Sequence, residues 1–257
     1  MTALNTPPLI EAIFELRWGE LSPGEFTFSQ DEQSLFPGKV STAAGSKGFS
    51  RCEMVNTNQG PVPIPSLVSH RFRQAENSWP CFQVGLGIFT VNQVTEGYDW
   101  DSFKNEIQKG IEIYNQAAPE KLNSAADTLN LVLRYQDAFF PEEGTSVEKF
   151  IESHFKINAN LPDSFLGHES INRGDSSINF QVNTATNTPK GQISIRIVNA
   201  IIAGKPGLLM ETIVSSKAVD AVDGELNSNA LLQWTEKAHD LQKHSFKTLI
   251  KKSAYSC

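Results

Sequence analysis

The sequence predicts an α+β fold in which antiparallel sheet structure is packed by two long helices. Short segments alternate apolar and polar side chains and are separated by glycine- and proline-containing turns, which is typical of antiparallel strands. Two longer segments carry apolar side chains at helical spacing. The 257 residues are 39% hydrophobic and 20% charged, which is ordinary globular composition. We therefore expect residues 1–257 to form a single compact unit with a substantial core.

The first strand is predicted over residues 11–18, shortly after Pro7 and Pro8. One face of this segment holds the apolar residues Ala12, Phe14, Leu16 and Trp18. The other face holds the charged residues Glu11, Glu15 and Arg17. A period of two with this contrast predicts a strand that turns one face to the core and a polar face away from it.

Residues 37–66 are rich in glycine and proline, so we expect a long loop there, with one short strand near residues 49–55. A loop of this length in a compact domain is typically mobile or functional. A strand or a tight hairpin follows over residues 81–92, with its pivot at Gly85 and Gly87.

The first long helix is predicted over residues 99–117, with Asp99 or Asp101 as its N-cap and Pro119 beyond its end. Its apolar stripe holds Phe103, Ile107, Ile111 and Tyr114. Side chains at this spacing share one face of a helix, so this face is expected to pack on the sheet.

The second part of the chain repeats this order of elements. A strand is predicted over residues 129–136, and a helix over residues 146–156 begins at a capping box of Thr145 and Glu148. Three further strands are predicted at about 177–184, 191–202 and 207–216. Their short turns make them antiparallel neighbours. The second long helix is predicted over residues 228–252.

A weak internal echo accompanies this repeated order. Leu16-Arg17-Trp18 ends the first strand, and Leu133-Arg134-Tyr135 recurs 117 residues later. One interpretation is a chain of two similar halves, 1–122 and 123–257. The other is that two strands merely share a binary pattern. A sheet wrapped around a long helix, with a ligand cleft between them, is the alternative architecture.

Composition excludes several classes of protein. With 22 Lys and Arg residues against 29 Asp and Glu, the net charge is −7, which argues against direct nucleic-acid binding. No apolar run is long enough to span a bilayer, and the first residues lack the basic start of a signal peptide. The cysteines Cys52, Cys81 and Cys257 are an odd, widely spaced set, so we expect no disulfide scaffold and a cytoplasmic location.

No metal or cofactor is expected. His239 and His244 are five residues apart on the last helix, whereas two histidines that share one zinc ion on a helix are four apart. Gly85 and Gly87 lie within strand-like sequence rather than between a strand and a helix, which argues against a dinucleotide site. No catalytic residues are predicted.

Five residues are predicted to bind a ligand or a partner. Arg17 and Arg134 lie on the polar faces of their strands, so two neighbouring strands would let both guanidinium groups share one anionic group. The alternative is that they pair with Glu15 or another nearby acid. Arg71 and Arg73 flank Phe72, and the three form a second candidate contact point that combines basic and aromatic groups.

Short motifs along the chain resemble a sporadically distributed, largely uncharacterised prokaryotic family of about this length. The motifs are Pro7-Pro8-Leu9-Ile10-Glu11-Ala12 with Phe14-Glu15-Leu16-Arg17-Trp18, Phe82-Gln83-Val84-Gly85, Tyr98-x-Trp100-x2-Phe103, and Trp234-x3-Ala238-His239-x6-Phe246-x2-Leu249-Ile250. The resemblance implies an accessory role in mobile and defence loci, and it brings no catalytic residues. Residues 37–66 are the part least like the family.

Together these observations favour a non-enzymatic protein-interaction or regulatory subunit, accessory to a prokaryotic defence, CRISPR-associated or toxin–antitoxin system. Its expected partner is a protein, for example a basic effector encoded nearby, because an acidic chain attracts a basic one. The first alternative is a small-ligand-binding domain with Arg17 or Arg134 in its pocket. The second is an enzyme without a recognisable motif, which requires a carboxylate or histidine with a strongly perturbed pKa in a cleft.

Overall fold

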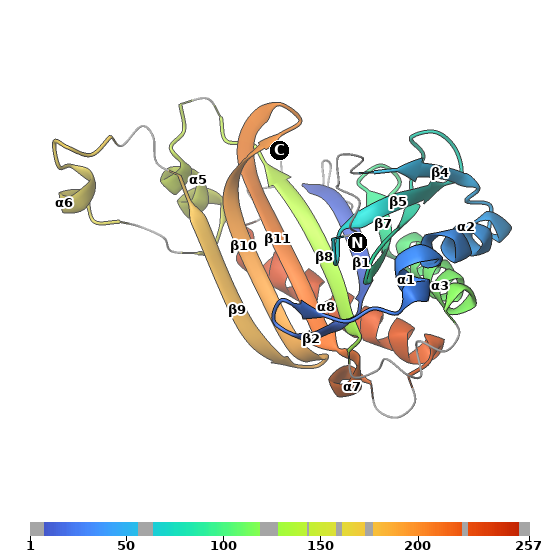
Figure 1. The fold of residues 1–257 in the computed structure, drawn as a ribbon. Helices are drawn as coiled ribbons and strands as arrows, with labels where there is room; N and C mark the ends of the chain where they lie inside the picture. Colours follow the sequence, from blue (N-terminus) through green and yellow to red (C-terminus); the bar gives the residue numbers. More distant parts are fainter. Residues whose placement is uncertain are drawn as a thin grey trace.

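A single large antiparallel sheet dominates the computed structural model, which describes residues 8–55, 64–118, 128–142, 144–157, 161–172, 177–222 and 226–251. Within these ranges nine strands pair in the order β4-β5-β6-β7-β1-β8-β11-β10-β9 (Figure 1). The strands are β1 (Leu9–Arg17), β4 (Arg51–Met54), β5 (Val68–Arg73), β6 (Cys81–Gly85), β7 (Ile88–Val94), β8 (Asn130–Phe139), β9 (Asn179–Asn187), β10 (Lys190–Ile202) and β11 (Lys205–Lys217). A separate small hairpin joins β2 (Glu20–Ser22) to β3 (Glu25–Phe26). The α+β class is confirmed.

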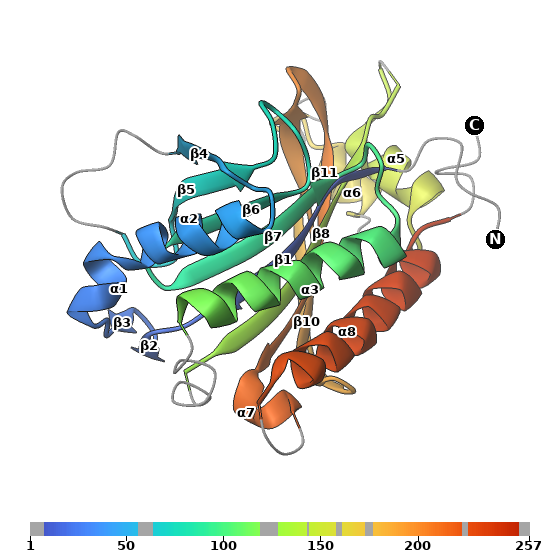
Figure 2. The same cartoon turned by 90° about the vertical axis from the view of Figure 1, so that its right-hand side faces the viewer.

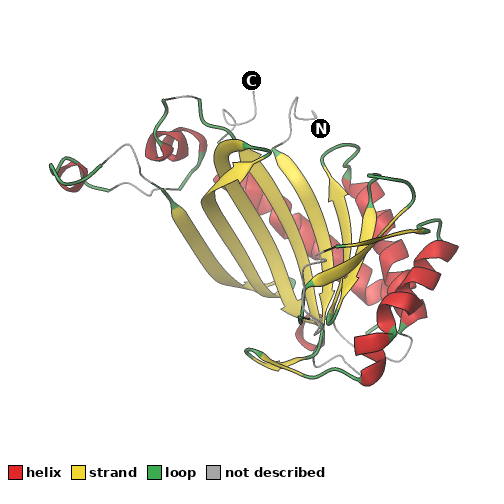
Figure 3. Cartoon of the chain, turned by 45° about the horizontal axis from the view of Figure 1, so that its top comes forward, coloured by secondary structure: helices red, strands yellow, loops and turns green. Residues whose placement is uncertain are grey.

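The three longest helices pack against one face of the sheet, called here the helix-covered face (Figure 2). They are α2 (Phe36–Ser46) over β5 and β6, α3 (Trp100–Ala117) over β7, and α8 (Ser228–Leu249) over β8 and β11. The shorter helices are α1 (Gln30–Ser34), α5 (Val147–His154), α6 (Asp163–Leu166) and α7 (Ala218–Ala221). No described helix lies over the opposite face of the sheet, called here the open face (Figure 3).

The strand order is nearly symmetric about its centre. The central pair is β1 and β8; β7, β6 and β5 follow outward on one side, and β11, β10 and β9 on the other. Helix α3 follows β7 and helix α8 follows β11, so each side has the same sequence of strands and helix, with β4 as an addition. The proposed boundary at residue 122 falls outside the described residues. A duplicated origin remains a prediction that this arrangement supports.

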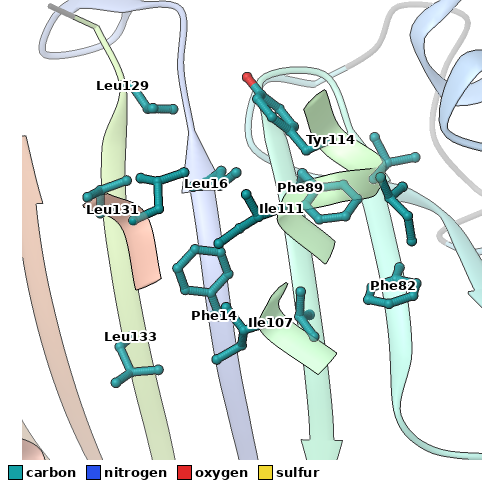
Figure 4. Packing of buried hydrophobic residues seen from close by; sticks show 14 of the residues in the cluster. Phe14, Leu16, Phe82, Phe89, Ile107, Ile111, Tyr114, Leu129, Leu131 and Leu133 are labelled. Carbon is teal, nitrogen blue, oxygen red and sulfur yellow. The ribbon is translucent and has the colours of Figure 1, made fainter. Parts of the chain in front are cut away.

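The larger of two buried clusters in the described residues lies between the helix-covered face and the helices α2, α3 and α8. A smaller one joins α5 to the ends of β8, β10 and β11. Alternate side chains of β1 and β8 point into the larger cluster, and the stripe of α3 packs on them (Figure 4). The labelled members are Phe14, Leu16, Phe82, Phe89, Ile107, Ile111, Tyr114, Leu129, Leu131 and Leu133. Because successive strand residues face opposite ways, this burial leaves Glu15 and Arg134 on the open face.

The two long helices occupy the predicted segments. Asp99 caps α3 by accepting a hydrogen bond from the backbone N–H of Ser102, and Asn227 caps α8 through Ala230. The segment 81–92 is a hairpin, in which β6 and β7 pair directly and Gly87 adopts a positive φ in the turn. Ser146 rather than Thr145 caps α5, accepting from the backbone N–H of Lys149, so the predicted N-cap was one residue too early.

The prediction of a loop over residues 37–66 was wrong for its first part. Residues 36–46 form helix α2 and residues 51–54 form strand β4, while residues 56–63 lie outside the described part. Pro37 stands in the first turn, where a missing backbone N–H costs nothing. The buried side chains Phe36, Val40, Ala43 and Ala44 recur at helical spacing, and their burial outweighs the low helix propensity of two glycines.

Gly110 allows α3 to approach the sheet closely. A methyl group at this position would overlap Cγ2 of Val91 on β7, whose branched side chain is buried and has little freedom to move. We therefore expect Gly110→Ala to lower the free energy of unfolding by about 1–3 kcal/mol, although alanine favours helix. Urea denaturation measures this change.

Gly45 in α2 provides the matched control. Nothing lies within 4 Å of a Cβ atom built there, so Gly45→Ala should raise the free energy of unfolding by up to about 1 kcal/mol. Equal effects of the two substitutions would contradict the proposed close contact between α3 and β7.

Candidate functional site

A chain of alternating charges crosses the centre of the open face. Arg17 donates from Nε to Glu15 Oε2 at 2.6 Å, and Arg134 donates from Nε to Glu15 Oε1 at 3.0 Å. Arg134 also reaches Glu211 Oε1 at 3.3 Å, and Nη1 of Arg196 lies 3.8 Å from Glu211 Oε2. We call these five residues the open-face network. They come from β1, β8, β11 and β10, so the network ties four adjacent strands together.

Strand register places these side chains next to one another. Ile13 pairs with Arg134 across β1 and β8, and Gln136 pairs with Glu211 across β8 and β11. The amide of Gln136 donates to Glu211 Oε1 at 2.9 Å, which adds a second donor to that carboxylate. The Glu15 side chain is 4% exposed, so the two arginines replace the water that this carboxylate loses.

The network continues as polar side chains toward β7. Asn92 donates from Nδ2 to Glu11 Oε1 at 2.7 Å, and Thr90 donates to Asn92 Oδ1 at 2.5 Å. Burial raises the pKa of Glu11, and the hydrogen bond from Asn92 and the charges of Arg71 and Arg134 oppose this rise. Polar side chains therefore extend across the open face from β7 to β10.

At the second predicted contact point, Arg73 is held by partners within the chain, whereas Arg71 is available for an external partner. Arg73 is 3% exposed, reaches Glu53 Oε2 at 3.3 Å, donates to the carbonyl of Ser78 and lies 4.4 Å from the ring centroid of Trp79. Arg71 makes no hydrogen bond or ion pair within the described part of the chain, and its buried Nε has no partner. Its guanidinium lies 5.9 Å from the Trp79 ring.

Phe72 does not belong to this contact point. It is fully buried on the helix-covered face, opposite Phe82, because it alternates with its two arginine neighbours along β5. The aromatic ring beside the arginines is that of Trp79, which the sequence did not indicate as a contact residue.

The structure brings Arg17 and Arg134 together through an acid of the protein itself. Their strands are neighbours, as the shared-anion hypothesis requires, but the shared carboxylate is that of Glu15. This is the alternative that the sequence left open. Of the predicted binding residues, Arg71 has an unpaired guanidinium group within the described part of the chain.

A second cluster of polar groups lies on the helix-covered face, beneath α8. The hydroxyl of Tyr135 lies 2.8 Å from the hydroxyl of Tyr98 and 3.0 Å from Nδ1 of His239. The His239 ring stacks on Trp100, with 3.7 Å between ring centroids and 6° between planes. With Asp137, we call these residues the Tyr135 cluster. Burial and the nearby charge of Lys243 lower the pKa of His239 to about 4, so its ring is neutral at pH 7.

Asp137 is the least expected member of this cluster. Burial alone raises the pKa of its carboxyl to about 7, and Oδ2 has no hydrogen-bond partner among the described residues. Burial raises the pKa of Tyr98 well above its ordinary value, and the charge of Asp137 adds to this rise. The strand pattern over 129–136 ends before Asp137, and a lone His on an amphipathic helix carries no specific signal, so sequence alone could not assemble this cluster.

Neither described cysteine has the character of a nucleophile. Cys52 is exposed, and burial raises the pKa of its thiol. Cys81 is buried, and burial raises the pKa of its thiol to about 12. In the part of the chain that the structure describes, no group of three or more His, Cys, Asp or Glu side chains is arranged to hold a metal ion. Among the described helices, none has the length and apolar character that a bilayer span requires.

Comparison of the chain with protein families, curated proteins and solved structures finds no match in any of the three. The resemblance to a prokaryotic family therefore remains a prediction from short motifs.

Glu15 is expected to stabilise the centre of the open face. Glu15→Gln keeps the side-chain shape and removes the charge that both Arg17 and Arg134 contact. Because the two arginines would then face each other without a counter-charge, we expect the free energy of unfolding to fall by about 3 kcal/mol. Asp31→Asn removes an acid from an exposed ion pair with Lys39 and should cost less than about 1 kcal/mol. Equal losses in urea denaturation would contradict a structural role for Glu15.

Asp137 is expected to make stability depend on pH. Its pKa is about 7 in the folded chain against the ordinary value of 3.8, so the folded state holds the proton more tightly. Stability from this group is therefore complete below pH 3.8 and is lost as pH rises through 7, with a slope of up to about 1.4 kcal/mol per pH unit.

Asp137→Asn should remove this part of the pH dependence. The difference in unfolding free energy between the variant and the unsubstituted chain, measured from pH 4 to pH 8, should grow in favour of the variant. A difference that stays constant with pH would show that Asp137 titrates normally.

Proposed function

We propose that this chain is a non-enzymatic protein-interaction or regulatory subunit that binds its partner through the open face of the sheet. The observation that carries this proposal is the pairing state of the arginines there. Arg17, Arg134 and Arg73 have carboxylate partners within the chain, whereas Arg71 has none among the described residues and lies beside Trp79. Arginine and tryptophan are the residue types that most often dominate binding energy at protein interfaces.

The open-face network supports binding rather than bond-making chemistry. Its charges are held by one another across four strands, so they form a rigid pattern of alternating sign. Such a pattern selects a partner with the complementary pattern and disfavours others. A partner carboxylate at Arg71 would supply the direct ion pair that this guanidinium does not make among the described residues, where Glu11 interacts with it only through longer-range charge.

The wider setting follows from charge and from the family resemblance. A net charge of −7 attracts a basic protein over long range, so a basic effector or regulator encoded nearby is the expected partner, and direct nucleic-acid binding is not expected. The resemblance adds a role accessory to a prokaryotic defence, CRISPR-associated or toxin–antitoxin system. We place the protein in the cytoplasm on its cysteine usage.

A small-ligand-binding domain is the second candidate function. The observation that favours it is the Tyr135 cluster, where a buried carboxyl lies between sheet and helix with an unpartnered oxygen. Arg17 and Arg134, which the sequence suggested for such a pocket, lie on the other face of the sheet.

Affinity capture with matched charge reversals tests the interaction. The tagged full chain is used to capture proteins from its native host at about 50 mM and about 500 mM salt, followed by mass spectrometry. We expect one stoichiometric partner, with binding weakened at least about tenfold by Arg71→Glu because a central arginine contributes strongly. Purified partner and titration calorimetry give the affinity.

Lys39→Glu is the control for this experiment. Lys39 lies exposed on α2, away from the open face, so its reversal changes the net charge equally and should leave affinity within about twofold. A partner retained equally by both variants, or no partner at either salt concentration, would overturn binding through the open face.

A further inference from the structure

The two edges of the sheet differ in how well they are protected against pairing with another strand. One edge is β4, which has four residues and two charged side chains, Arg51 and Glu53. Arg51 lies 3.5 Å from Glu53 Oε1 and 3.4 Å from Glu76 Oε2. The other edge is β9, which has nine residues and no charged side chain. Short length and charge protect an exposed edge, so β4 has this protection and β9 lacks it.

Strand β9 is a regular template for a further strand. Its pairing with β10 runs from Asn179 to Asn187 without a shift of register, so no bulge bends it away. Among the described residues it pairs with β10 alone, and no described element lies along its outer side (Figures 1 and 3). Every second residue of such a strand directs its backbone N–H and C=O outward, where the sheet offers them no partner.

The apolar layer of the helix-covered face continues to this edge. Phe180 lies opposite Ile197 of β10, and Val182 lies opposite Ile195. Ile197 is buried and Ile195 packs on the core, whereas the Val182 side of the row is open to water, with this residue 40% exposed. A further strand with apolar side chains on the same face would remove this surface from water, which favours association.

The pattern of β9 is complementary to itself. The nine-residue strand is centred on Asn183, so full antiparallel overlap with a second copy sets Asn183 against itself. Val182 then meets Thr184 of the second copy on the helix-covered face, and Phe180 meets Thr186. No pair brings like charges together, which a chain of net charge −7 has to avoid at an interface with itself. A basic partner, in contrast, would find no acidic side chain on β9.

We propose that β9 pairs in antiparallel fashion with β9 of a second copy of this chain and forms a two-fold symmetric dimer. One sheet then runs through both copies. Assembly ends at the dimer, because the same edge is used by both copies and the edge that remains, β4, is short and charged. The two-fold axis is perpendicular to the sheet, so the open faces of both copies lie on the same side of the dimer.

Sedimentation velocity on the full chain tests the dimer, at concentrations from about 1 μM to about 100 μM. We expect twice the monomer mass at the upper end of this range, with no larger species. Because the paired strands carry no charge, raising the salt concentration from about 50 mM to about 500 mM should not weaken the dimer.

Charge variants at the centre of β9 assign the dimer to this edge. Asn183→Lys and Asn183→Asp each set two like charges against each other across the two-fold axis, so each should raise the dissociation constant at least about tenfold. An equimolar mixture of the two variants should recover the dimer, because unlike charges then meet. Gln233→Lys makes the same change of charge on the exposed side of α8 and should alter the dissociation constant by less than about twofold. Circular dichroism shows whether each variant is folded.

Three results would overturn the proposal. They are a monomer at every concentration, a dimer that Asn183→Lys and Gln233→Lys affect equally, and a mixture of the two Asn183 variants that remains monomeric. The first needs no variant, so it decides the question even if a substitution prevents folding.

The dimer and the proposed partner binding are independent. Arg71 lies on β5, toward the opposite end of the sheet from β9, so Arg71→Glu should leave the dimer unchanged. Loss of the dimer in Asn183→Lys would likewise leave the Arg71 side chain in place, so either proposal can fail while the other stands.

Discussion

The antiparallel pairing of β1 with β8 is the interaction on which the rest of the structure depends. These strands lie at the centre of the sheet, and each carries core residues on one face and charged residues on the other. Their register sets Phe14 opposite Leu133 in the core and Ile13 opposite Arg134 on the open face. Shifting either strand by one residue would bury charges and expose the core, so packing and ion pairing both require the same alignment.

Glu15 shows how the two faces are linked. Its neighbours Phe14 and Leu16 are fully buried, and this fixes the backbone that holds the carboxylate within the sheet. A carboxylate with so little access to water needs charged donors, and Arg17 and Arg134 provide them. Charges that are already paired are poor sites for a further ligand. Our proposal therefore places partner binding at Arg71, whose guanidinium makes no ion pair within the described part of the chain.

Local sequence patterns predicted the strands and helices well where the apolar residues followed a single period. The strand at 11–18 and the helix at 99–117 were found because period and cap agreed. The loop predicted at 37–66 failed over α2 because glycine and proline were weighed above the spacing of four buried side chains. The site residues were predicted only in part: Arg17 and Arg134 do meet, but Phe72 faces the core and Trp79 takes its place.

The sequence by itself determined which side chains share a face, because strand and helix periods are local properties of the backbone. It also determined the class of fold, since short turns between strands require antiparallel neighbours. Only the tertiary structure decided which faces meet. Arg134 contacts Glu15 from 119 residues away, and Tyr135 contacts His239 from 104 residues away. Such contacts follow from the order of strands in the sheet, which depends on the packing of the whole chain rather than on any segment.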